Sequence, residues 1–433
     1  MSTLTAQAPA PQARPVPRGV VPARSWRQPV VLWVMGLLSL VAFGVGSPGG
    51  TRSTFGLSSA GQVLQLPALP LPSRPTALVL AVLGLVIAGV VTHLVRTRRP
   101  VAVWWTVGFG VTFAVAFLVW AVADQEVSLV SLLRGSVFLA TPLVFGALGG
   151  VLCERAGVIN IAIEGQLLAG AFLSAVVASL VGGPVGVYVG LVAAPLAGLF
   201  FGWLLAVFAI RYLVDQVVLG VVINVLVIGL TSFLYGQVLV EDADRWNTPG
   251  RLPRVEVPVL SEIPLLGPVL FDQSVVVYLM YVAVVVLHLA LFRTRWGLRV
   301  RAVGEHPKAA DTAGIDVNRL RFRNVLMGGA MAGLGGAFFT LGSVGAFGEE
   351  MTAGQGFIAL AALIFGRWSP IGALVAALLF GVAGNLASVL SIIGSPIPGE
   401  LLLMAPYLAT IFAVAGLVGK VRAPAADGVP YRP

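Results

Sequence analysis

Three polar side chains stand close together in a stretch that is otherwise almost entirely apolar. The stretch is "ERAGVINIAIEGQLLAGAF" (154–172), and the side chains are those of Asn160, Glu164 and Gln166. An ionised carboxylate in lipid costs at least about 2.5 kcal/mol, so Glu164 is expected to face the protein interior, pair or be protonated. On a regular helix Asn160 and Glu164 share one face, and Gln166 points elsewhere. Two uses remain open: the groups line a polar path for a hydrophilic solute, or they fasten a bent helix to its neighbour.

Two further amides, Asn224 and Asn385, each interrupt an apolar segment. Amide side chains in such segments commonly form hydrogen bonds between helices. We therefore favour a contact between helices for both, with contact to a solute as the alternative. Together with the first three residues they are the candidate members of a substrate path.

No group of residues in the sequence is typical of catalysis. We find no histidine and aspartate near a credible nucleophile, no H-E-x-x-H and no G-x-x-x-x-G-K-[ST] phosphate loop. The single cysteine, Cys153, cannot form an intrachain disulfide or a metal cluster. We expect no enzyme, no catalytic or metal-binding residue and no cofactor in this chain. The remaining classes are a transporter driven by a partner, an ion-coupled secondary transporter with Glu164 as proton carrier, and a structural membrane assembly.

The elements that position these residues are membrane spans. With 58% hydrophobic and 10% charged residues, and a mean hydropathy of +0.96, the chain is too apolar for a soluble domain. About twelve apolar runs are long enough, at about 1.5 Å per residue, to cross about 30 Å of hydrocarbon. The runs are 30–46, 76–95, 101–123, 135–152, 157–180, 184–210, 216–239, 274–292, 324–345, 352–366, 370–393 and 401–419. The predicted fold is an all-α polytopic membrane protein of about 10–12 transmembrane helices, some of them short or broken.

The basic residues indicate the orientation. With the N-terminus in the cytoplasm, most arginines and both lysines fall on the cytoplasmic side, and both termini are cytoplasmic. Orientation therefore explains the net charge of +9, and nucleic-acid binding is not needed to account for it. Residues 1–28 are rich in proline, alanine and arginine and are predicted to be a disordered cytosolic tail. Residues 421–433 are predicted to be a second cytosolic tail.

The predicted cytoplasmic loop 293–323 contains a short helix. Pro307 suits the first turn of a helix, and Gly314 suits the position after its last turn. Ala309, Ala310 and Ala313 give this helix of about two turns a low-relief face on which another protein can rest. Its flanking arginines are explained as lipid anchors and orientation signals.

Three separated stretches resemble one protein family. They are "ERAGVINIAIEGQLLAGAF" (154–172), "RAVGEHPKAADTAGIDVNRLR" (301–321) and "MTAGQGFIALAALIFGRWSPIGALVAALLFG" (351–381). All three are similar to the permease subunits of bacterial nucleoside and simple-sugar ABC importers, within the broader group of branched-chain amino acid and ribose permeases. The resemblance makes 135–420 the permease core. Residues 29–134 are then extra N-terminal membrane segments.

The resemblance implies a function and a set of partners. The chain would form half of a translocation path for nucleosides, or alternatively for simple sugars, in the bacterial cell membrane. It would pair with a second, homologous permease and with an extracytoplasmic substrate-binding lipoprotein. A separate ATPase with two nucleotide-binding halves would bind ATP and Mg. The coupling helix that contacts this ATPase would comprise Gly304, Glu305, His306, Pro307, Lys308, Ala309, Ala310, Ala313 and Gly314.

Overall fold

Ten helices in the described part of the chain are long and apolar enough to cross a membrane. The computed structural model describes residues 26–58, 62, 64–394, 404 and 422–432. The ten spans are α1 with η1 (Arg27–Leu38, Ser39–Val45), α2 (Ser73–Arg96), α3 (Val103–Ala121), α4 (Leu129–Glu154), α5 (Ile163–Val181), α6 with η2 (Gly183–Ala206, Val207–Arg211), α7 with η3 (Gln216–Leu234, Tyr235–Leu239), α10 (Val275–Arg293), α13 with η4 (Val317–Ala337, Phe338–Val344) and α15 (Pro370–Ile392). The predicted all-α polytopic fold is confirmed. The run predicted at 401–419 and most of the tail predicted at 1–28 lie outside the described residues.

One of the predicted runs, 352–366, is a half-length helix. Its helical part is α14 (Gln355–Phe365), whose 11 residues extend about 16 Å, roughly half of a hydrocarbon core. Irregular chain at 345–354 leads into it from the end of η4. Short or broken helices were expected from the sequence, and this segment is one of them.

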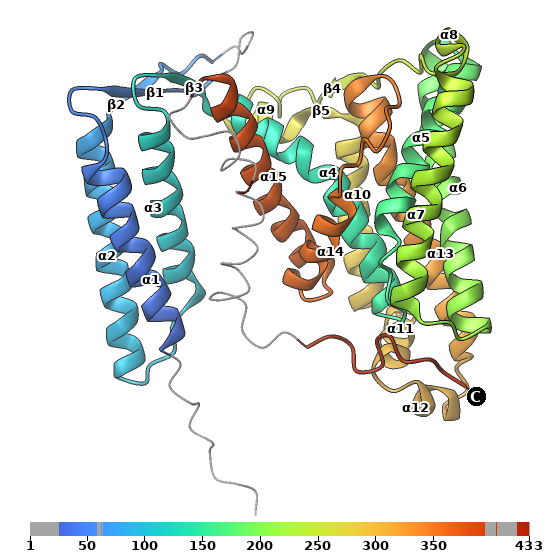
Figure 1. Ribbon diagram of the computed structural model, residues 1–433. Helices are drawn as coiled ribbons and strands as arrows, with labels where there is room; N and C mark the ends of the chain where they lie inside the picture. The colour runs from blue at the N-terminus through green and yellow to red at the C-terminus, as the bar shows by residue number, and fades with distance from the viewer. Residues whose placement is uncertain (1–25, 59–61, 63, 395–403, 405–421, 433) are drawn as a thin grey trace, which may run out of the picture.

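The two ends of the molecule differ in the elements that they carry. The five strands found in the described residues all lie at one end, which we call the strand end (Figure 1). A three-stranded sheet has the order β2-β1-β3, and a second sheet pairs β4 with β5. The elements of this end are β1 (Arg52–Gly56), β2 (Leu69–Pro72), β3 (Glu126–Ser128), α8 (Ala243–Trp246), β4 (Arg254–Glu256), α9 (Leu266–Phe271) and β5 (Asp272–Ser274). The opposite end carries α11 (Arg295–Glu305), α12 (Pro307–Thr312) and residues 422–432, and we call it the α12 end.

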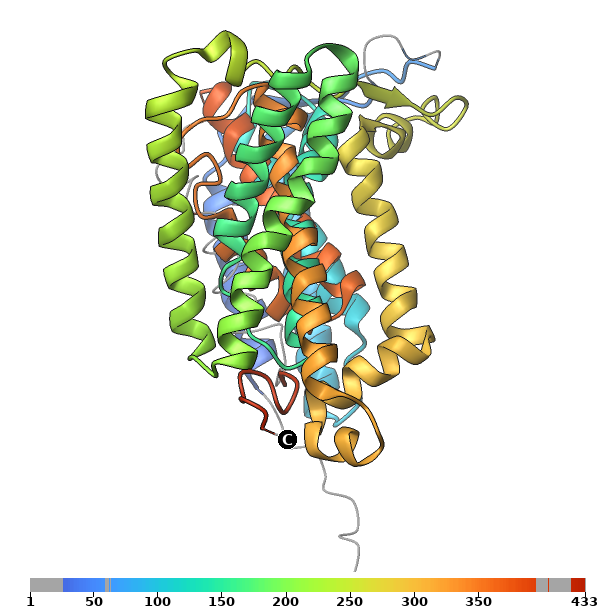
Figure 2. The same ribbon diagram turned by 90° about the vertical axis from the view of Figure 1, so that its right-hand side faces the viewer.

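Helix α4 runs through the centre of the core, between α15 and α14 on one side and α5 and α13 on the other (Figures 1 and 2). It is apolar around its whole circumference and is almost entirely buried, as expected for a central helix. Beside it, α5, α6 and α13 approach one another at glycines. A methyl group on Gly170 of α5 would overlap the backbone of Gly333 in α13, and one on Gly333 would overlap the backbone of Gly198 in α6. Small residues at these positions let the helix backbones approach each other closely.

The first three spans, α1 to α3, form a separate bundle beside the core (Figure 1). Their contacts are made by large side chains, such as the ring of Phe43 against those of Phe113, Phe117 and Trp120. The bundle joins the core at the strand end, where β1 pairs with β3 and the end of α3 packs against α15. This bundle therefore contributes no side chain to the polar cluster described next.

Candidate functional site

The connection between α4 and α5 is a turn, and it corrects one prediction. Residues 155–162, which we call the signature turn, are not helical, and Gly157 has a φ of +89°. Because α5 begins only at Ile163, the predicted helix face shared by Asn160 and Glu164 is wrong. Asn160 Nδ2 instead donates a hydrogen bond to Gln166 Oε1, at 2.9 Å.

Glu164 fastens α5 to the half-length helix α14. Its Oε1 accepts hydrogen bonds from Thr352 Oγ1 (2.6 Å) and from the Gly354 amide (2.8 Å). Its Oε2 accepts one from the Gly356 amide, at 2.6 Å. A methyl group on Gly356 would overlap the Glu164 backbone, so the two segments are in direct contact. Both carboxylate oxygens are therefore committed as acceptors to the segment 352–356.

The surroundings of this buried carboxylate explain why it is tolerated. Glu164 lies in the first turn of α5 and at the first residues of α14, so two helix N-termini meet at one carboxylate. Each N-terminus carries a partial positive charge. Broken helices in transporters often direct such N-termini at an anionic group of the substrate. In this chain the anionic group is the protein's own Glu164.

Helix α7 holds the signature turn from the other side. Asn224 Oδ1 accepts from the Gly165 amide at 2.8 Å, and Asn224 Nδ2 donates to the Ile161 carbonyl at 2.9 Å. About two turns earlier, Gln216 Oε1 accepts from the Ile159 amide at 2.8 Å. The prediction that Asn224 joins its helix to another segment of the core fits this geometry. Sequence reasoning missed Gln216, although a second amide on the same helix was a usable signal.

Asn385 lies apart from the other four residues. Its Nδ2 donates to the Leu132 carbonyl at 2.6 Å and so joins α15 to the first turns of α4, near the strand end. Asn160, by contrast, follows the other end of α4. The structure thus brings Asn160, Glu164, Gln166 and Asn224 together and places Asn385 elsewhere.

Two atoms of this cluster have no hydrogen-bond partner among the described residues. They are Asn160 Oδ1, an acceptor, and Gln166 Nε2, a donor, and both side chains are fully buried. Buried polar groups are nearly always hydrogen-bonded, so an unsatisfied pair calls for an explanation. The cluster has spare capacity for one donor and one acceptor, which a hydroxyl group or a water molecule would meet.

At the α12 end the structure contains the predicted short helix, α12 (Pro307–Thr312), followed by Gly314 with a φ of +80°. The residues of the predicted coupling segment are not equally accessible. Gly304 and Ala310 are buried, Pro307 is half-buried, and the exposed ones are Glu305, His306, Lys308, Ala309, Ala313 and Gly314. Ala309 and Ala310, equivalent in the sequence-based prediction, therefore have different surroundings.

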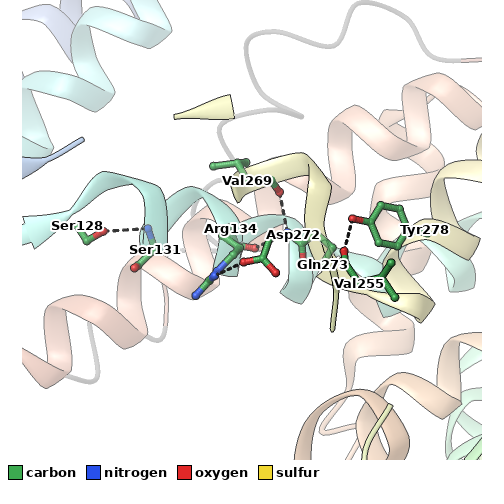
Figure 3. Close-up of polar contacts among 8 residues, drawn as sticks. All are labelled: Ser128, Ser131, Arg134, Val255, Val269, Asp272, Gln273 and Tyr278. Carbon is green, nitrogen blue, oxygen red and sulfur yellow. Dashed lines mark hydrogen bonds and ion pairs between the residues drawn. The ribbon is translucent and has the colours of Figure 1, made fainter. Parts of the chain in front are cut away.

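A pocket of about 330 Å³ opens at the strand end, and sequence reasoning missed it. It is lined by Arg134 of α4, Arg251 of the loop between α8 and β4, Arg254 of β4, and Asp272 and Gln273 of β5, among others. Figure 3 shows the ion pair between Arg134 Nη1 and Asp272 Oδ2, at 2.8 Å, and the bond from Gln273 to the Val269 carbonyl. Three arginines and one aspartate make the lining basic. These residues come from separate segments, which explains why no local pattern revealed them.

The polar groups found here form hydrogen bonds and ion pairs. Within residues 26–394 and 422–432, as far as they are described, no three His, Cys, Asp or Glu side chains are grouped so that they could hold a metal ion. The single cysteine, Cys153, is buried in α4. The arrangement is suited to holding helices together and to contacting a polar solute.

The comparisons with known proteins agree with this picture. Residues 132–418 match the family described as "Branched-chain amino acid transport system / permease component". The guanosine ABC transporter permease protein NupQ of Bacillus subtilis is 42% identical over 302 residues, which cover 67% of this chain and 93% of the relative. The nucleoside ABC transporter permease protein NupC of Lactococcus lactis is 40% identical with the same coverage. The putative glucose ABC transporter permease protein TsgC13 of Haloferax volcanii is 35% identical, covering 59% of this chain and 76% of the relative.

The guanosine ABC transporter permease protein NupP of Bacillus subtilis is also similar, at 26% identity over 296 residues. No solved structure matches the chain. The matched region contains the signature turn, Glu164 with its partners, and α12, whereas α1 to α3 precede it. The family match covers more than half of the chain, and together with the ten apolar helices it shows that this multi-pass membrane protein belongs to the branched-chain amino acid transport system permease family.

Proposed function

We propose that this chain is the transmembrane permease subunit of an ATP-driven importer of nucleosides and forms half of its translocation path. The observation that carries the proposal is the 42% identity to a guanosine permease across 93% of that relative's length. A second nucleoside permease matches almost as well. The putative glucose permease, at 35% identity, supports simple sugars as the alternative cargo.

The polar cluster fits an uncharged, hydroxylated solute. Glu164 occupies the anion position at the two helix N-termini, so this position is not open to an anionic solute. Asn160 Oδ1 and Gln166 Nε2 offer one acceptor and one donor, which match hydroxyl groups and base edges. Both atoms are buried in this conformation, so the solute reaches them only after the helices around the signature turn separate.

The assembly that we propose contains three further proteins. The pair NupP and NupQ supports a second, homologous permease. Because this sequence has no phosphate loop, ATP and Mg are bound by a separate ATPase with two nucleotide-binding halves. An extracytoplasmic lipoprotein delivers the solute to the strand end, where the basic pocket lies.

The orientation follows from the placement of the chain ends. Helix α1 begins at the α12 end, and residues 422–432 also lie there (Figure 1). We place this end in the cytoplasm of a bacterial cell and the strand end outside its plasma membrane, so that both termini are cytoplasmic. The arginines of α11 then lie on the cytoplasmic side, as the positive-inside rule requires.

Helix α12 is the proposed contact with the ATPase. When the ATPase closes, α12 moves, and α10 and α13, which flank the loop that carries α11 and α12, tilt with it. Such coupling requires that the ATPase bind the two conformations differently.

The exposed Ala309 is the informative position for a test of this contact. Ala309→Arg is expected to prevent ATPase binding and uptake while membrane insertion stays normal. Ala310 is not suitable, because it is 4% exposed and a larger side chain there would disturb the local packing.

Uptake measurements test the proposed function. Cells expressing this chain with its partner proteins are given labelled uridine or adenosine, with unlabelled ribose as competitor and with vanadate or a protonophore as inhibitor. Uptake that vanadate stops and ribose does not compete is the expected result. Competition by ribose would move the cargo to sugars.

The ion-coupled alternative makes a different prediction in the same experiment. If Glu164 carried protons, uptake would respond to the protonophore alone. A proton carrier needs neighbouring groups that can take the proton from it. Two of the three groups bonded to Glu164 are backbone amides, which act only as donors and cannot take a proton, so the geometry favours the ATP-driven mechanism.

A further inference from the structure

Residues 422–432, which we call the C-terminal strap, are packed against the protein at the α12 end. The Ala426 amide donates to the Gly304 carbonyl at 2.8 Å, and the Ala425 amide donates to Glu305 Oε2 at 3.3 Å. Both acceptors belong to the last residues of α11, directly before α12. The tail predicted from the sequence at 421–433 is therefore in contact with the segment proposed to bind the ATPase.

The strap also contacts the coupling helix itself. Tyr431, 8% exposed, packs in one apolar cluster with Val303, Ala310 and Val317. Ala310 is the buried alanine of α12, and Val317 is the first residue of α13. The inner face of α12 thus rests on the end of the strap, while Ala309 stays free on the outer face.

A buried arginine ties the strap to α13. Arg321, only 2% exposed, donates from Nη1 to the Val429 carbonyl at 2.8 Å and from Nη2 to the Ala426 carbonyl at 3.4 Å. The carboxyl group of Asp427 lies close to this guanidinium and to the carboxyl group of Glu154. A buried arginine needs acceptors for its donors, and the strap supplies them for Nη1 and Nη2, while Nε has no partner among the described residues.

The same strap touches the signature turn. A methyl group on Gly157 would meet Arg321 at 2.6 Å and the Ala426 carbonyl at 3.0 Å, and one on Gly428 would meet the Ile159 side chain at 2.7 Å. A direct contact between α11 and the turn exists as well, because a methyl group on Gly304 would overlap the Arg155 carbonyl. The strap is thus a second link between α11 and the signature turn, and unlike the direct contact it also includes α12.

We propose that the C-terminal strap holds α12 and the signature turn together as one moving unit, so that movement imposed on α12 by the ATPase reaches the polar cluster. The inference rests on the proposed coupling role of α12. It assigns Tyr431 and Arg321 as positioning residues for transport. If the strap is lost, the ATPase still binds the exposed face of α12, but its movement is passed on less completely.

The test compares ATP hydrolysis with uptake in the complete transporter. A chain that ends at residue 421, and separately Tyr431→Ala, are expected to retain ATPase binding and hydrolysis while the number of solute molecules carried per ATP falls about tenfold. Arg432→Ala, an exposed neighbour, is the matched control and should leave this ratio unchanged. A strap that only stabilises the fold would lower hydrolysis and uptake together and leave the ratio intact, which would overturn the proposal.

A cross-linking experiment tests whether the strap moves together with α11 and α12. Glu305→Cys combined with Ala425→Cys puts two exposed thiols at neighbouring positions, and the native Cys153 is buried and does not react. Joining them with a short bifunctional thiol reagent should leave uptake at the level that the same double variant shows before cross-linking. If cross-linking abolishes uptake, while labelling of either single variant does not, the strap must detach during transport and the proposal is wrong. Absent uptake by the unmodified transporter would refute the proposed function instead.

Discussion

The permease core and the N-terminal bundle of α1 to α3 are both apolar and helical, yet different contacts hold them together. In the core, glycines bring backbones into direct contact, and side chains such as Asn224 form hydrogen bonds to the backbone of another segment. In the bundle, aromatic rings around Phe43 fill the space between helices. Backbones in contact leave no room for an added atom, whereas interlocking side chains can readjust. The region shared with the relatives is thus the one with the least tolerance for added volume.

The largest expected effect comes from adding volume to the core. Gly170→Leu places a side chain where the backbone of Gly333 lies, and we expect it to destabilise the protein by at least about 3 kcal/mol. Folded protein should then be absent from detergent extracts examined by size-exclusion chromatography. The matched control is Gly110→Leu in α3, where nothing lies within 4 Å of the added carbon. Equal damage from both substitutions would remove the contrast between core and bundle.

Removing the carboxylate that joins α5 to α14 should have the next largest effect. Glu164→Ala leaves the buried Thr352 hydroxyl, the buried Gly356 amide and the half-buried Gly354 amide without an acceptor, and an unpaired buried donor costs about 1–3 kcal/mol. We expect a lower melting temperature and loss of uptake, with Glu164→Gln intermediate. Glu262→Ala, in an exposed loop at the strand end, is the control. Full uptake by Glu164→Ala would show that the junction of α5 and α14 is dispensable.

A cavity in the bundle should destabilise that part alone. Phe43 is 6% exposed, and Phe43→Ala is expected to cost the bundle about 3 kcal/mol. Because this bundle lies outside the matched region, uptake should fall less than twofold. Proteolysis in the bundle should become faster than in Val45→Ala, whose side chain is exposed. Loss of uptake in Phe43→Ala would mean that the bundle takes part in transport.

The smallest expected effect is a pH dependence of the strap. Burial raises the pKa of Asp427 to about 7, while the positive charge of Arg321 opposes this shift. The other titratable groups that face the Asp427 carboxyl group are Glu154 and Cys153. An acid whose pKa is raised on docking binds its proton more tightly when docked, so docking is strongest at low pH and weakens as pH rises through about 7. Hydrogen exchange in residues 422–432, corrected for the intrinsic rate, should show less protection at pH 8 than at pH 6. Asp427→Asn should remove this difference; if the difference persists, another group is responsible.

The sequence predicted most of the fold, because apolar runs of span length report burial in lipid directly. It also predicted α12, since Pro307 and Gly314 have preferences that act locally. The signature turn was missed because Gly157 has a positive φ and leaves no room for a side chain beside Arg321 and Ala426, and both of these neighbours are distant in the sequence. The strap was missed for a related reason: every partner of residues 422–432 named above lies more than 100 positions away in the sequence.

The junction of Glu164 with two helix N-termini has an electrical consequence. Each N-terminus is equivalent to about half a positive charge, and the carboxylate contributes one negative charge. The junction is therefore close to electroneutral, although each of its parts is charged. A helix that moves carries its negative C-terminal end along with its positive N-terminal end, so a displacement of α5 together with α14 still moves the formal charge of Glu164, and this step of the cycle depends on the membrane potential if it crosses part of the field.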